Sequence, residues 1–187
     1  PMNDLIPNKT YFFFSHTTKK QAYNRELLRT LLKKNIRMID YENLTNSKGI
    51  RVVAFGRYAG IVGAYNGILT YGKRFDLFNL KPAHQCFDME EMQSEYSKVK
   101  LPPIKIVLTG GGRVAKGAME VLNGMGIRKV RTSEFVEQTF NEPVYVQVNI
   151  QHYNKTKNGE AFDRLQFYAN PELFESNFLR FAKNTSR

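Results

Sequence analysis

The chain has 187 residues, of which 28 are basic and 17 acidic, so its formal net charge at pH 7 is +11. Its hydrophobic content of 42% is ample for a packed core and excludes the disordered and fibrous classes. The length fits one domain or two small ones. Cys86 is the single cysteine, which excludes a disulfide framework and a cysteine-rich metal site and fits a reducing cytoplasm. His84 and Cys86 lack further ligands at metal spacing, so no metal is predicted.

A positive charge of this size makes nucleic acid the first partner to consider. The basic residues are scattered over turns and expected helix ends, as at Lys19-Lys20 and Lys73-Arg74, and they form no stripe. No segment has the length of a membrane span, and the first residues lack a signal-peptide pattern. The sequence therefore predicts neither a nucleic-acid nor a membrane partner, and the charge fits a basic cleft for small anionic molecules or solvated faces.

The first part of the chain predicts a strand, a helix and a second strand. Residues 8–15 are rich in phenylalanine and β-prone. Thr18 and Gln21 have capping-box spacing, and leucines then recur at helical period as far as Asn35, which predicts a helix of about four turns. Residues 36–41 form the next strand, and two strands joined through a helix are normally parallel.

His16 follows the first of these strands, at the carboxyl end where open α/β sheets place their ligands. Its imidazole is a candidate proton carrier, and the alternative is a plain hydrogen-bonding group at the start of a helix. Lys19 lies three residues further on. If the two side chains are close, the ammonium disfavours a protonated imidazole and keeps His16 available as a base.

Residues 51–67 join a short β-branched run to small residues spaced three and four apart. Each glycine in a helix costs about 1 kcal/mol relative to alanine, but the smooth face suits close packing against another backbone or a crossing between domains. Arg51 begins this run. Its guanidinium is a candidate clamp for a carboxylate, and the alternative is a surface arginine ahead of a strand.

The central part of the chain predicts a buried strand, a glycine turn and a helix. Residues 104–108 are nearly all apolar, which is typical of a parallel strand covered on both faces. Gly110, Gly112 and Ala115 fit the G-x-G-x-x-G/A pattern, which brings backbone N–H groups to a pyrophosphate and packs the helix on the strand. Together with Arg113 they are the candidate dinucleotide-binding residues. A plain turn that binds nothing is the alternative.

Residues 127–132 predict the second strand of the nucleotide fold, and residues 144–148 a third. An NAD site normally has an acidic residue about twenty positions beyond the first glycine. Arg131 stands there instead, which predicts a contact to the 2′-phosphate of NADP or weak binding, unless Glu134 serves. A helix is expected from Pro171, with these side chains inward: Leu173, Phe174, Phe178 and Phe181.

Three separated segments, residues 14–21, 49–60 and 110–117, resemble one family. They are similar to the lysine-forming saccharopine dehydrogenases, within the alanine dehydrogenase and NAD(P) transhydrogenase α-subunit family. The most specific of the three contains the run Arg-x-x-Ala-Phe-Gly-x-x-Ala-Gly. The resemblance implies a Rossmann-like fold, with two parallel-sheet α/β domains that flank a cleft and are both incomplete in this chain.

The same resemblance implies a division of the chain. Residues 1–55 would form part of an N-terminal substrate and catalytic domain. Residues 56–187 would form an inter-domain helix and part of a dinucleotide-binding domain. His16 and Lys19 would be catalytic, and Arg51 would hold a carboxylate of the substrate.

The implied enzyme oxidises saccharopine by hydride transfer to NAD or NADP and hydrolyses the imine to lysine and 2-oxoglutarate. A further catalytic lysine of the family falls before Pro1, so we expect a central fragment that is inactive alone. The alternatives are an alanine dehydrogenase-like enzyme acting on a smaller amino acid, and a non-catalytic dinucleotide-binding or interaction module. The sequence leaves the oligomeric state open.

Overall fold

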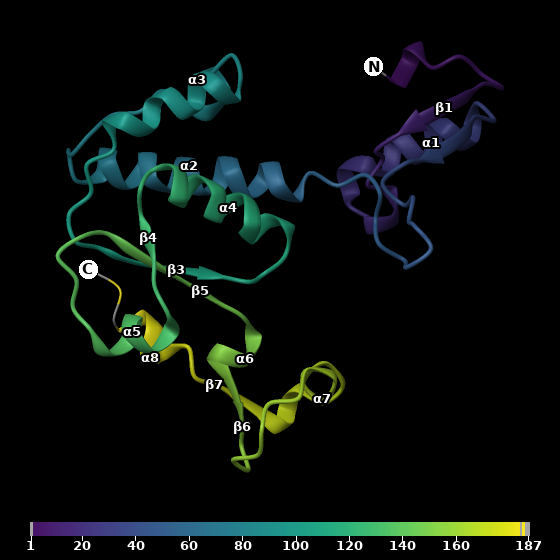
Figure 1. The fold of residues 1–187 in the computed structure, drawn as a ribbon. Helices are drawn as coiled ribbons and strands as arrows, with labels where there is room; N and C mark the ends of the chain where they lie inside the picture. The colour runs from purple at the N-terminus through teal and green to yellow at the C-terminus, as the bar shows by residue number, and fades with distance from the viewer. Residues whose placement is uncertain (1, 184, 186–187) are drawn as a thin grey trace. The chain divides into compact units, whose positions relative to one another are not determined.

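The structure is a computed structural model that describes residues 2–183 and 185 (Figure 1). The chain divides into two compact units, Pro1–Phe55 and Gly56–Arg187, which we call the first and the second unit. Each unit has a parallel sheet whose strands are connected through helices. The predicted α/β class with Rossmann-like parallel sheets is therefore confirmed.

The first unit contains strands β1 (Thr10–Phe13) and β2 (Arg37–Asp40), which are parallel and are joined through helix α1 (Arg25–Lys33). A short 3-10 turn, η1 (Met2–Asp4), precedes them. Leu31 is the one hydrophobic side chain of this unit that is fully buried among the described residues. The strand, helix, strand order follows the prediction, but the apolar core is small.

Helix α1 is shorter than predicted, and the capping box at Thr18 is wrong. Two 3-10 turns, η2 (Thr17–Lys19) and η3 (Ala22–Asn24), occupy its expected first turns, and Lys20 between them has a left-handed φ of 52°. The Ser15 hydroxyl accepts the backbone N–H of Thr17 at 3.1 Å. Such local side-chain bonds compete with helix formation, so the regular helix begins only at Arg25.

The second unit is a three-stranded parallel sheet between two layers of helices (Figure 1). Its strands are β3 (Lys105–Thr109), β4 (Arg128–Lys129) and β5 (Val144–Val148), in the order β3-β5-β4. Helices α2 (Gly56–Arg74) and α4 (Arg113–Gly124) cover one face, and α5 (Thr132–Glu137) and α8 (Leu179–Ala182) cover the other. The central strand β5 is almost completely buried.

Side chains alternate across this sheet as a period of two requires. Tyr145 packs with Ile68 of α2 and Leu122 of α4. Its neighbours Val144 and Val146 pack instead with the helices of the opposite face. Both faces are therefore apolar, and the third strand predicted for residues 144–148 is confirmed as the buried centre of the sheet.

Helices α2 and α4 approach so closely that their backbones touch. A Cβ added to Gly60 would lie closer than 3.0 Å to the carbonyl oxygen of Val114, and one added to Gly117 would meet the carbonyl oxygen of Arg57 equally closely. The expected close packing of the small-residue face against another backbone is confirmed, and its partner is α4.

Strand β4 differs from the prediction in length and in position. It spans two residues of the expected six and pairs with β5, so β5 separates it from β3. The carboxylate of Glu134 accepts the backbone N–H of Arg131 at 2.8 Å, which starts α5 and ends the strand. Arg128 and Lys129 are exposed, and charged residues suit the edge of a sheet while the valine-rich β5 suits its centre.

The last segment is not the single helix expected from Pro171. A 3-10 turn, η6 (Pro171–Leu173), leads into strand β7 (Phe174–Ser176), which pairs antiparallel with β6 (Asn154–Thr156) before α8 begins. Phe174 packs against the rings of Phe162 and Phe167, which favours the extended backbone. The remaining elements are η4 (Ala83–Gln85), α3 (Met89–Ser94), η5 (Glu95–Lys98), α6 (Ile150–Tyr153) and α7 (Arg164–Ala169).

Candidate functional site

A cluster of charged side chains lies at the carboxyl edge of the sheet in the first unit. His16 and Lys19 come from the turns after β1, and Glu42 follows β2. His16 Nδ1 lies 2.8 Å from one carboxylate oxygen of Glu42, and Lys19 Nζ lies 2.9 Å from the other. Lys19 Nζ is also 3.0 Å from His16 Nδ1, so the two residues that we expected to share a site do lie together.

Glu42 is the buried member of this cluster, at 3% exposure. The backbone N–H of His16 donates to its carboxylate at 3.1 Å. Burial acts to raise the pKa of Glu42, but the hydrogen bonds and charges of Lys19 and His16 outweigh it and hold that pKa below its ordinary value. Glu42 is therefore ionised at neutral pH and holds the imidazole and the ammonium in place.

Asp40 fixes the two chain segments that carry the cluster. Its carboxylate accepts the hydroxyl of Ser15 at 2.6 Å and the backbone N–H of Ser15 at 3.3 Å. It also accepts the backbone N–H of Glu42 at 3.0 Å. The residue that ends β2 thus ties together the starts of the two turns that present His16 and Glu42.

Arg51 joins the cluster from the end of a loop. One guanidinium nitrogen lies 3.8 Å from the Glu42 carboxylate, and the group stands over the ring of Phe14 at 5.6 Å. The ring of His16 meets the same phenylalanine edge-on, with ring centroids 4.9 Å apart. The structure therefore brings together His16, Lys19 and Arg51, which the sequence singled out. They surround Glu42, and Asp40 fixes the segments that carry it; the sequence analysis named neither of these two carboxylates.

Glu42 carried a signal that the sequence interpretation did not use. It follows the second of two parallel strands, as His16 follows the first, and the carboxyl ends of such strands meet at one edge of the sheet. In the tautomer that donates Nδ1–H to Glu42, Nε2 is the ring nitrogen that can exchange a proton with a substrate; in the other, Nδ1 accepts from the Lys19 ammonium. The side chains of Lys19 and Arg51 are 48% and 40% exposed, so they present positive charge to an anion.

The second unit has a polar pocket of about 460 Å³ at the carboxyl ends of β3 and β5. The glycine turn from Gly110 to Gly112 forms one side of it, and Asn149, which follows β5, forms another. Gly110 has φ of 93°, a conformation that glycine adopts most easily, and its N–H donates to the Val148 carbonyl at 2.7 Å. Gly112 precedes the first residue of α4.

This turn has the room that a phosphate group requires. A Cβ on Gly110 or Gly112 would meet nothing within 4 Å, so their outer surface is open. A Cβ on Gly111 would lie 2.6 Å from the side-chain oxygen of Asn149, so the turn rests against that residue. The residues present therefore fit the phosphates of a dinucleotide, which backbone N–H groups and the start of a helix bind well.

The amino-acid sequence is similar to those of two named groups of enzymes, although no family model matches it. Over 200 residues it is 34% identical to the alpha-aminoadipic semialdehyde synthase, mitochondrial, of Bos taurus, an alignment that covers 95% of the chain. Over 125 residues it is 30% identical to the saccharopine dehydrogenase (NAD(+), L-lysine-forming) of Candida glabrata, which covers 61% of the chain and 34% of that relative. The chain is a homologue of the saccharopine dehydrogenases. The resemblance found in the three segments is confirmed.

This homologue of the saccharopine dehydrogenases spans 22% of the length of the cattle relative and 20% of that of the alpha-aminoadipic semialdehyde synthase of Arabidopsis thaliana. The alignment to the cattle enzyme takes in 95% of the chain, so it includes most of both units. The charged cluster and the glycine turn thus belong to one aligned region.

Three further residues were predicted to bind the cofactor: Arg113, Ala115 and Arg131. They do not all lie together in the structure. Arg113 is the first residue of α4 and is exposed, while Ala115 in the same helix is 4% exposed. Arg131 starts α5 beyond β4, and it is not among the residues that line the glycine-turn pocket. Residues 127–132 were expected to form the second strand of the nucleotide fold, and in the observed sheet β5 lies between β3 and β4.

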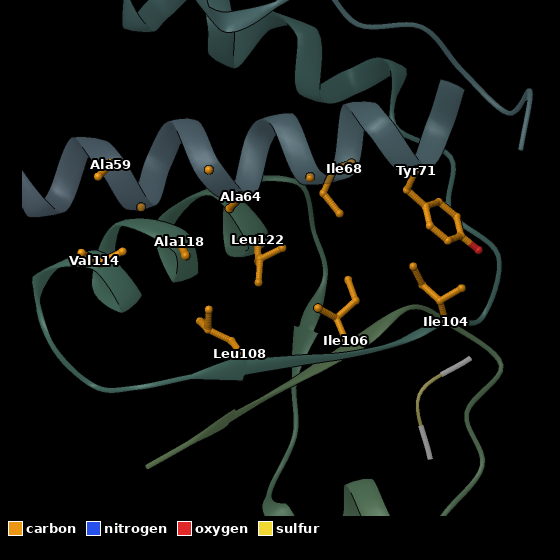
Figure 2. Close-up of a pocket in the computed structure, with 13 residues that line it drawn as sticks. Ala59, Ala64, Ile68, Tyr71, Ile104, Ile106, Leu108, Val114, Ala118 and Leu122 are labelled. Carbon is orange, nitrogen blue, oxygen red and sulfur yellow. The ribbon is translucent and has the colours of Figure 1, made fainter. Parts of the chain in front are cut away.

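A second cavity of about 470 Å³ lies between α2, α4 and β3. Figure 2 shows its lining, which includes Ala64 and Ile68 from α2 and Ile106 and Leu108 from β3. Apart from the phenol of Tyr71, the side chains that line it are aliphatic. We therefore take the charged cluster and the glycine turn as the candidate sites.

Two further observations concern partners. Within the described residues, no group of three or more His, Cys, Asp or Glu side chains is arranged to hold a metal ion. None of the described helices combines the length and the apolar character needed to cross a membrane.

Proposed function

We propose that this chain carries the proton-transfer cluster and part of the cofactor site of an NAD(P)-dependent oxidoreductase of the saccharopine dehydrogenase type. The reaction is saccharopine, water and oxidised dinucleotide giving lysine, 2-oxoglutarate, reduced dinucleotide and a proton. The single observation that carries the proposal is the buried carboxylate of Glu42 holding His16 and Lys19 at the carboxyl edge of the first sheet.

The bound dinucleotide would supply the oxidant, since its nicotinamide accepts a hydride from the carbon beside the secondary amine of saccharopine. The backbone of the glycine turn, from Gly110 to Gly112, would bind its phosphates. Whether the cofactor is NAD or NADP is part of the proposal. The name of the fungal relative specifies NAD(+), and the names of the alpha-aminoadipic semialdehyde synthases specify no cofactor.

His16 would move the protons of the hydrolysis. Its Nε2 accepts a proton from the water that attacks the imine carbon, and it returns a proton to the leaving amine of lysine. Glu42 stabilises the imidazolium that forms in between. Lys19 and Arg51 would bind carboxylates of the substrate, which carries several.

The proposal predicts a large loss of activity when His16 is removed. In the complete natural polypeptide, His16→Ala should lower the rate of saccharopine-dependent dinucleotide reduction by about 100-fold or more, the usual contribution of a general acid–base group. His84→Ala is the matched control, because His84 is an exposed histidine of the second unit. A His16→Ala enzyme that works at the wild-type rate would refute the proton-transfer role.

The compartment belongs to the same proposal. The single cysteine, Cys86, predicts a reducing compartment, which we interpreted as the cytoplasm. The name of the cattle relative includes the word mitochondrial. Immunofluorescence of the tagged natural protein with a mitochondrial marker separates the two locations.

A further inference from the structure

The wall of the glycine-turn pocket that is contributed by α7 has no role in the function proposed so far. Arg164 and Tyr168 line the pocket from this helix, together with Gly110 to Gly112. The Arg164 guanidinium stands over the ring of Tyr168, 5.7 Å from its centroid. Both side chains are exposed, with Tyr168 at 61%, so they are accessible to a ligand.

Arg164 is a cation whose charge the described residues leave available. Its neighbour Asp163 is engaged elsewhere, since its carboxylate accepts the backbone N–H of Gln166 at 2.6 Å and caps α7. No ion pair joins Arg164 to a carboxylate in the part of the chain that the structure describes. A guanidinium in this state suits a phosphate, which it binds through two parallel hydrogen bonds.

Two sides of the pocket, the glycine turn and the end of β5, are linked to each other by hydrogen bonds. The side-chain amide of Gln147 donates to the Gly110 carbonyl at 2.7 Å and to the side-chain oxygen of Asn149 at 3.0 Å. The glycine turn and the end of β5 are therefore linked by one residue. A ligand that contacts both sides therefore binds with little loss of conformational entropy in the protein, because the two sides do not have to be brought together on binding.

The strand order places this pocket where part of a dinucleotide is expected. Ligands of open α/β sheets lie outside the carboxyl ends of neighbouring strands whose connections leave on opposite faces. The chain leaves β3 for α4 on one face, and after β5 it reaches α8 on the other. The strand beside β3 is β5, so the pocket lies over β5 rather than over β4, which ends near Arg131.

We propose that the adenosine half of the cofactor occupies this pocket, with the base against Tyr168 and with Arg164 binding a 2′-phosphate on the ribose. This inference rests on the proposed dinucleotide function and assigns to Arg164 the phosphate contact that the sequence suggested for Arg131. An arginine on an aromatic ring is well placed for both contacts, since the ring holds the guanidinium plane while its N–H groups face the ligand. The volume of about 460 Å³ is within the usual range of small-molecule sites, roughly 300–1,000 Å³.

The test is isothermal titration calorimetry of the complete natural polypeptide with NADPH and with NADH. Arg164→Ala should raise the Kd for NADPH by about tenfold to 100-fold, the range of a lost charge-assisted hydrogen-bond pair, and should leave the Kd for NADH within about twofold. Arg131→Ala is the matched control and should change neither value. Tyr168→Leu should weaken both cofactors alike, because both carry the same base.

Each other result overturns the inference. A loss of NADPH binding in Arg131→Ala but not in Arg164→Ala would restore the assignment to Arg131. An equal loss of NADPH and NADH binding in Arg164→Ala would place the guanidinium on the pyrophosphate instead. Unchanged binding in Arg164→Ala, with a wild-type protein that binds NADPH, would refute this inference alone, whereas a wild-type protein that binds neither dinucleotide would refute the proposed function as well.

Discussion

The interior of the first unit and the interior of the second unit are stabilised by different kinds of contact. In the first unit the buried groups are mainly polar: Glu42 and Ser15 are each 3% exposed, and Leu31 is the one fully buried hydrophobic side chain among the described residues. In the second unit, apolar side chains fill both faces of a sheet, and two helices touch through their backbones at Gly60 and Gly117.

Because of this difference, the stability of the first unit should respond to pH and the stability of the second unit to added side-chain volume. A cluster of charges around one carboxylate depends on pH, because protonation removes the attraction that holds it. A close contact between backbones depends on volume, because there is no side chain that can move aside. The proposed chemistry uses both properties: proton transfer requires groups that titrate, and cofactor binding requires a turn that keeps its shape.

The largest effect is expected from added volume in the second unit. Gly60→Ala should destabilise this unit by about 3 kcal/mol or more, because the new methyl group meets the Val114 carbonyl oxygen and the helices must separate. Gly63→Ala is the control on the same helix, since nothing lies within 4 Å of its added Cβ. It should stabilise α2 by about 0.5–1 kcal/mol.

Urea unfolding followed by hydrogen exchange and mass spectrometry assigns these changes to each unit. Equal effects of the two substitutions would mean that α2 does not contact α4 as described. A change in the hydrogen exchange rates of the first unit would show that its stability depends on the contact between α2 and α4.

The second effect is expected from the charge in the first unit. The folded-state pKa of Glu42 is lowered from its ordinary value of 4.5, so the ionised carboxylate stabilises the fold above pH 4.5, and this contribution is lost as the pH falls through the lowered pKa. Glu42→Gln should therefore lower the urea midpoint of the first unit at pH 7, and the difference from wild type should shrink toward pH 3.

Glu26→Gln is the matched control, because Glu26 is an exposed glutamate whose side chain is 63% accessible. It should have little effect at either pH. A difference between wild type and Glu42→Gln that stays the same from pH 7 to pH 3 would contradict the role assigned to the charge of Glu42.

The smallest effect concerns the starts of two helices. Asp88 caps α3 in the second unit by accepting the backbone N–H of Glu91 at 2.9 Å, so Asp88→Ala should cost about 1 kcal/mol. Asn24 precedes α1 in the first unit but makes no capping bond, and its buried amide nitrogen has no hydrogen-bond partner among the described residues. Asn24→Ala should therefore change the urea midpoint little, and a loss equal to that of Asp88→Ala would disprove the distinction.

The sequence predicted those features that depend on neighbouring residues. The valine-rich run of β5 and the small-residue face of α2 are local patterns, and both formed the expected elements. His16 and Lys19 lie together because they are three residues apart after β1, whereas Arg51 reaches the cluster from a loop and was placed in the same site only by the family resemblance.

The features that were missed depend on competition between distant segments. β5 took the central position because its residues are more apolar than those of β4, and no local pattern of residues 127–132 contains that comparison. Arg164 and Tyr168 reach the glycine turn from a helix that begins more than fifty positions later in the chain. Glu42 is a different case, because its position directly after β2 was a local signal that went unused.

The backbone contact of α2 with α4 has a mechanical consequence. α4 begins directly after the glycine turn, and α2 begins at Gly56, the first residue of the second unit. Gly60 and Gly117 join the two helices near these ends without side chains that could yield between them. The two helices can yield little at this contact, so a displacement of the glycine turn on ligand binding would reach residue 56 with little loss.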